Sequence, residues 1–292
     1  MIGDDGHPQS RAREVGSAIY TIARNELLLQ TRYRTKFLLD LFSPVLALAP
    51  IMLTAYFLTS GRESGNLAQS VGLPDHFTFI MLGYMAFAAL GVGNPIMHYT
   101  GSAWTMRMLQ ETGVLERNLL APMPREALIL GTGLYYAVLY LFHVAYVLAA
   151  SLIFLDLDFA LTASGIAVAG GLLIAMSMMS ILLGFLMAAV SLVMRDGSVA
   201  LLVIHRPFLL LTGAYFLVEL LPQPFRFLAM VNPLAYAIDA FRGSLSSSTL
   251  LLPLAVECVI VVVSTVLIGI VGIWVFRRIL DRQLRTGELS IY

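Results

Sequence analysis

The chain has 292 residues, of which 59% are hydrophobic and only 12% are charged. Soluble domains carry about 25% charged residues, so this chain has too few polar side chains to cover a globule in water. Its formal net charge is zero, which gives no case for nucleic acid as a partner. A single cysteine, Cys258, excludes a disulfide framework and a cysteine-based metal site. The composition predicts an all-α polytopic membrane protein.

Residues 1–36 are predicted to form a cytoplasmic N-terminus that ends in a basic amphipathic helix. The apolar side chains of this helix recur at helical spacing and have arginines around them; they are Val15, Ala18, Ile19 and Ile22. Such a helix is typical of a segment that lies on the inner leaflet, in contact with membrane lipids. A solvated helix next to the membrane is the alternative. The polar start does not fit a signal peptide.

Residues 37–276 are predicted to cross the membrane six times. A helix needs about 20 apolar residues to cross a hydrocarbon core of about 30 Å. Five runs meet this length easily, and a sixth is interrupted by polar residues. The predicted spans are residues 37–59, 78–99, 127–154, 162–194, 198–218 and 251–276. Residues 277–292 form a C-terminal tail.

The cationic residues predict the orientation of the chain. If the N-terminus is cytoplasmic, all but three of the 18 lysine and arginine residues fall on the cytoplasmic side, as the positive-inside rule requires. The three outside are Arg62, Arg226 and Arg242. Both termini are then cytoplasmic, which requires an even number of spans and supports the interrupted one as a true crossing. The expected location is the cytoplasmic (inner) membrane of a cell.

The cytoplasmic loop between the second and third spans is predicted to hold a short helix over residues 113–121. Thr112 is suited to cap its start and Pro122 to end it. Its apolar face is formed by Val114, Leu115 and Leu119, with Glu116 and Arg117 away from it. A short helix held between two rigid spans is suited to dock a soluble partner. It is equally suited to anchor the loop at the membrane surface, and the pattern alone does not decide.

The extracytoplasmic stretch 219–243 is too apolar for open solvent and is predicted to dip back into the outer leaflet. Asn232 and Pro233 form a helix start, and Gly243 a helix end. Its apolar face is formed by Leu234, Ile238 and Phe241. On the other side, Asp239 and Arg242 are predicted to pair at i, i+3. Structural packing is favoured over substrate contact for this stretch.

The interrupted crossing places charge inside the membrane. A helix that began at Pro207 would have about 12 residues and a length of about 18 Å, which is too short to span. The helix must therefore begin near Ser198, with His205 and Arg206 in the inner half of the bilayer. An intramembrane arginine usually faces a cavity or a partner, although it can also snorkel to the headgroups. Together with Glu257 in the outer half of the last span, these two residues are candidates for a translocation path.

No pattern in the sequence supports an enzyme or a resident metal. The only lysine, Lys36, has no glycine-rich phosphate loop before it, so an energy source is expected outside this chain. The histidines lack metal-ligand spacing. A secondary, ion-coupled carrier or channel that uses Glu257 and Arg206 is the main alternative to an ATP-driven transporter. A membrane scaffold that moves nothing is a third possibility.

Three segments resemble those of a known family. Residues 111–125 resemble the cytoplasmic signature E-x-G-x-L-E-x-L-L-x-x-P-x-x-R of type-2 ABC transporter permeases, although Asn118 departs from it. Residues 232–242 resemble the family's N-P-L-x-Y-x-x-D-x-x-R stretch before the last span, and residues 24–32 resemble its entry helix. By this resemblance the ATPase-coupling residues would be Glu111, Gly113, Val114, Leu115, Glu116, Leu119 and Arg125, and the outer re-entrant motif would contain Asn232, Pro233, Tyr236, Asp239 and Arg242.

The resemblance implies the membrane permease of an ATP-driven exporter for a drug, lipid or lipid-linked glycan. It implies two separate nucleotide-binding ATPase subunits, which bind ATP and Mg, and a second permease protomer, more readily an identical one than a different one. No cofactor is expected in this chain. Residues 111–121 would be the coupling helix, and 219–243 an outer re-entrant element. ATP binding would push the coupling helix and shift the N-terminal helix and spans one, two and five.

Overall fold

The computed structural model describes residues 8–35, 37–39, 41–42, 76–89, 105–106, 108–120, 123–154, 159–194, 211–214, 217–246 and 250–286. Over these residues the structure is helical and contains no strand. Most of the first and fifth predicted spans, with His205 and Arg206, lies outside the described residues, as does the side chain of Glu116. The helices are α1 (Pro8–Arg32), α4 (His76–Ala89), α6 (Val114–Leu120), α7 (Ala127–Phe154), α8 (Ala163–Val193), the 3-10 helix η1 (Val218–Leu220), α10 (Gln223–Val231), α11 (Pro233–Leu245) and α12 (Leu254–Thr286).

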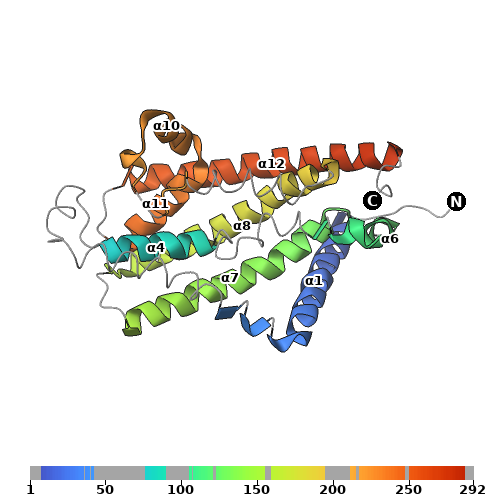
Figure 1. Cartoon of the computed structure of the whole chain (residues 1–292), viewed down its shortest axis with the longest axis horizontal. Coiled ribbons are helices and arrows are strands. Elements are labelled where there is room, and N and C mark those ends of the chain that lie inside the picture. The colour runs from blue at the N-terminus through green and yellow to red at the C-terminus, as the bar shows by residue number, and fades with distance from the viewer. Residues whose placement is uncertain are drawn as a thin grey trace.

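Within the described residues, three helices, α7, α8 and α12, are long and apolar enough to cross a membrane. They contain 28, 31 and 33 residues and correspond to the predicted third, fourth and sixth spans. The helix α4, with 14 residues, begins two residues before the predicted second span and overlaps its first half. Figure 1 shows the three long helices running along the molecule, with α1 and α6 at one end and α10 and α11 at the other. This arrangement agrees with the opposite sides predicted for the two motif segments, whereas the total of six spans stays a prediction.

Glycines bring α8 and α12 together. A Cβ atom on Gly272 would lie 2.9 Å from the backbone oxygen of Leu182, and one on Gly269 would lie 2.9 Å from the Leu182 side chain. At Gly272 the close atom belongs to the backbone and cannot yield, so glycine permits this approach, whereas at Gly269 it is the flexible end of the Leu182 side chain. Small residues are typical of such seams between membrane helices, where close backbone packing replaces the hydrophobic effect.

The two largest apolar clusters of the described residues lie near opposite ends of the bundle. The α11-end cluster joins α4, α7, α8, α11 and α12; it includes Leu82, Met85, Met176, Ile238, Phe241 and Val261. The α6-end cluster joins α6, α7, α8 and α12; its buried members are Met106, Leu115, Leu128, Ile129, Phe185, Ala188, Ala189, Leu192, Phe276 and Leu280. Each motif segment therefore packs into a core of its own.

The N-terminal helix α1 packs on α7. A Cβ atom on Gly131 of α7 would lie 2.6 Å from Cβ of Ile22, so the missing side chain makes room for α1. The four apolar positions predicted to face lipid are half-buried, because part of this face is occupied by α7. Leu27, Leu28 and Leu29 are exposed and remain available to lipid.

Candidate functional site

The loop segment before α6 turns on a glycine. Backbone amides of Thr112 and Gly113 donate to the carbonyl oxygens of Met108 and Gln110, each at 3.0 Å, and close a helical turn. Gly113 follows with φ of 67°, the left-handed conformation that favours glycine, and α6 begins at the next residue. The predicted cap at Thr112 is wrong, because its hydroxyl donates back to the Met108 carbonyl at 2.7 Å.

The predicted apolar face of α6 is turned toward this chain. Leu115 is only 2% exposed and belongs to the α6-end cluster, and Leu119 packs against that cluster. Val114 is half-buried. An apolar face on a short loop helix buries itself against the nearest apolar surface, which here lies in its own bundle. A soluble partner would therefore meet the other side of the segment, where Glu111, Gly113, Arg117 and Leu120 are exposed.

Two ion pairs join the end of this segment to α12. Arg125 pairs with Asp281, and Glu126, which directly precedes α7, pairs with Arg277. Of these residues the motif contains only Arg125; Glu126, Arg277 and Asp281 were not predicted. Their signal in the sequence is weak: an Arg-Glu dipeptide before one helix and an Arg and an Asp four positions apart near the end of another.

The outer helix α11 begins as predicted. The side-chain oxygen of Asn232 accepts a hydrogen bond from the Leu234 amide at 3.1 Å, and Pro233 occupies the first helical position. The Tyr236 hydroxyl donates to the Met230 carbonyl in α10 at 2.8 Å. The helix runs on to Leu245, two residues beyond the glycine that was predicted to end it.

Arg242 is buried and connects three parts of the chain. Its side chain donates to the carbonyl oxygens of Phe79 in α4 at 3.2 Å, of Gly213 at 2.8 Å, and of Ala214. The guanidinium also lies 3.6 Å from the centroid of the Phe79 ring, a cation–π contact. A Cβ atom on Gly83 of α4 would overlap both the Ala214 oxygen and this guanidinium, so glycine is needed there. Burial lowers the pKa of Arg242 to about 9, which leaves it charged at neutral pH.

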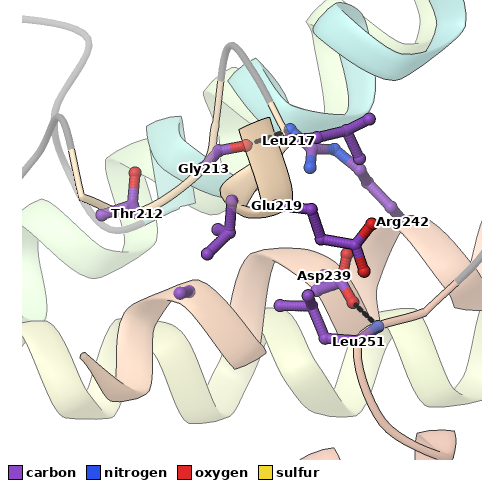
Figure 2. A pocket seen from close by; sticks show the side chains of 9 residues that line it. Thr212, Gly213, Leu217, Glu219, Asp239, Arg242 and Leu251 are labelled. Carbon is purple, nitrogen blue, oxygen red and sulfur yellow. Dashed lines mark hydrogen bonds between the residues drawn. The ribbon is translucent and has the colours of Figure 1, made fainter. Parts of the chain in front are cut away.

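The predicted pair of Asp239 and Arg242 is replaced by separate contacts. Asp239 Oδ2 accepts a hydrogen bond from the Leu251 amide at 2.7 Å, while Arg242 points to Gly213, as Figure 2 shows. Among the described residues no direct ion pair joins the two, although the positive charge of Arg242 still acts on the pKa of Asp239. Burial has the larger effect and raises the pKa of Asp239. The side of α11 that carries Arg242, opposite its predicted apolar face, is buried rather than solvated, because α4 and residues 211–214 cover it.

Glu257 lies in the first turn of α12 and is fully buried. Its Oε1 accepts a hydrogen bond from the Leu252 amide at 3.0 Å. The carboxyl groups of Asp239 and Glu257 are thus bound by two consecutive backbone amides, those of Leu251 and Leu252. Beside Asp239 lies a cavity of about 30 Å³, lined by Thr212, Gly213, Leu217, Val218, Glu219, Ala235, Asp239, Arg242 and Leu251. It has room for about two water molecules and none for a lipid or a drug. A role for Glu257 in a translocation path stays a prediction.

The family model described as "ABC-2 type transporter" matches residues 17–246, which include most of α1, the segment before α7 and the whole of α11. No curated protein matches the chain.

Proposed function

The chain belongs to the ABC-2 type transporter family, and from this we propose that it moves its substrate outward with energy from separate ATPase subunits. As a member of this family it is a permease subunit and a multi-pass membrane protein, and the family is a transport component that is not itself catalytic. Two such subunits would bind ATP and Mg, and a second, identical permease protomer would complete the transporter. The substrate would be hydrophobic or amphipathic: a drug, a lipid or a lipid-linked glycan.

The observation that carries this proposal is the geometry of residues 108–120 and 123–126 within a chain of this family. The segment has a buried side, anchored by Leu115, and an exposed side with Glu111, Arg117 and Leu120, the last 85% exposed. A surface that is half charged and half apolar, fixed to the bundle from behind, is suited to seat in a cleft of a soluble protein. The exposed side is therefore the proposed ATPase contact.

The proposed membrane arrangement has six spans, with both termini in the cytoplasm and the protein in the cytoplasmic membrane. The excess of arginine near α1, α6 and the end of α12 supports this orientation. When ATP draws the ATPases together, they would push α6 and, through Leu115, the α6-end cluster. The buried side would transmit a movement at the surface to the long helices, because packed cores shift between arrangements and do not deform continuously.

The decisive experiment is purification of the full chain from its native membrane, followed by transport in vesicles. We expect an ATP-binding subunit to co-purify, and the reconstituted complex to move a fluorescent amphipathic lipid only with ATP. An ATPase variant that lacks its phosphate-loop lysine is the matched control. Transport driven by a proton gradient without any ATPase would favour the ion-coupled carrier instead. A bound ATPase with no movement of any substrate would favour the scaffold.

A further inference from the structure

The last helix is longer than a membrane crossing requires. A hydrocarbon core of about 30 Å takes about 20 residues of helix, whereas α12 has 33. With the buried Glu257 near the start, about a dozen residues remain beyond the core at the other end. Figure 1 places this end of α12 at the same end of the molecule as α6. The extension, residues 275–286, thus lies on the side of the proposed ATPase contact.

The extension packs against the segment that would receive the ATPase. Phe276 and Leu280, which are 0% and 1% exposed, belong to the same cluster as Leu115 of α6 and Met106. Phe276 also contacts Phe185 of α8, with ring centroids 5.6 Å apart at an angle of 73°. A movement of Leu115 would therefore act on the same apolar cluster that holds the extension of α12.

The two ion pairs fix how the extension sits on this segment. Arg277 and Asp281 are one helical turn apart on α12, and they face Glu126 and Arg125 with opposite charges. Each pair is partly exposed, and an exposed pair alone contributes little to stability. Two neighbouring pairs nevertheless favour one register of the helices, since both pairs can form only in that register and a shift by one turn would break at least one of them.

We propose that Glu126, Arg277 and Asp281, with Arg125, are positioning residues that make the α12 extension the receiver of the coupling movement. This inference rests on the proposed function. It adds α12 to the elements that would receive the movement of the coupling helix, which the family resemblance gives as the N-terminal helix and spans one, two and five. Neither these three residues nor α12 belongs to the coupling motif predicted from the sequence.

A charge-swap experiment on the complete transporter tests this. We expect Glu126→Arg and Arg277→Glu, each alone, to lower the substrate moved per ATP hydrolysed about five-fold, because each makes one pair repulsive. The double variant Glu126→Arg/Arg277→Glu restores the pair and should return this ratio to near the wild-type value. Arg282→Glu, an equal charge change at an exposed position of the same helix, is the matched control and should leave it unchanged.

The thermal midpoint and the affinity for the ATPase, measured on the same variants, separate positioning from folding. Positioning predicts that both stay near wild type while the transport ratio falls. If the thermal midpoints of the single variants fall in proportion to their transport ratios, or if the double variant does not restore the transport ratio, the inference is wrong. Should the Glu126 variants not fold, the independent swap Arg125→Asp/Asp281→Arg gives the same test. If even the wild-type chain binds no ATPase, the proposed function fails, whereas a coupled wild type with unaffected variants overturns this inference alone.

Discussion

Arg242 shows what a buried charge requires in this protein. A guanidinium has five N–H donors and cannot be left without acceptors in an apolar interior. Here three backbone carbonyls and an aromatic ring supply them, and a glycine in α4 leaves the space. The residue is therefore an anchor of α11 on α4 and on residues 211–214, and its removal should loosen all three.

We expect Arg242→Gln to lower the free energy of unfolding by about 3 kcal/mol, as is typical when one member of a buried charged network is removed. Thermal unfolding of the purified protein in detergent measures this. Arg242→Lys should recover little, since an ammonium cannot reproduce the planar fork or the stacking on Phe79. Arg285→Gln, at an exposed position of α12, is the control and should change the midpoint little. An unchanged midpoint in Arg242→Gln would contradict the anchoring role.

At the scale of the element, α6 depends on one backbone conformation. Gly113 has φ of 67°, and a Cβ atom added there would meet nothing within 4 Å, so any penalty comes from the backbone alone. We expect Gly113→Ala to destabilise the turn by about 1 kcal/mol and Gly113→Asn by less, because asparagine tolerates the left-handed region.

ATP-driven transport should fall in the order glycine, asparagine, alanine at this position, since α6 would spend less time in place. The measurement is initial transport rate in vesicles with the ATPase bound. Gly16→Ala in α1, which also has open space around the added Cβ but no left-handed φ, should cause no loss. Equal rates for Gly113→Ala and wild type would show that the turn does not set the position of α6.

The elements with strong local signals could be predicted from the sequence. The runs that became α7, α8 and α12 were recognised from length and hydropathy, and the start of α11 from Asn232 and Pro233. The inward turn of Leu115 could not be predicted, because the cluster it enters comes from helices distant in sequence. The same holds for the three carbonyls around Arg242, which are backbone groups without a sequence signature.

At the scale of the whole molecule, the two motif segments lie at opposite ends of the bundle (Figure 1). If the proposed orientation is right, one end is cytoplasmic and the other faces outward. In a Cys258→Ser background, Ala160→Cys, at an exposed position between α7 and α8, should react in intact cells with a maleimide that does not cross membranes. A cysteine at position 282 in α12 should react only after the membrane is opened.

Both sites are exposed in the fold, so a difference in labelling reports the membrane side rather than burial. Labelling is read by mass spectrometry of the purified chain, with the parent Cys258→Ser protein as the blank. The reverse pattern, with position 282 reactive in intact cells, would invert the topology and remove the basis for an ATPase contact at α6.

The seam between α8 and α12 limits the kind of motion open to this transporter. The backbone oxygen of Leu182 lies so close to Gly272 that a shift of one residue along the axis, about 1.5 Å, is expected to bring it toward residues that have a Cβ atom. We therefore expect α8 and α12 to tilt together and not to slide along each other. A movement at one end of this helix pair should reach the other end as a change in the tilt of both helices.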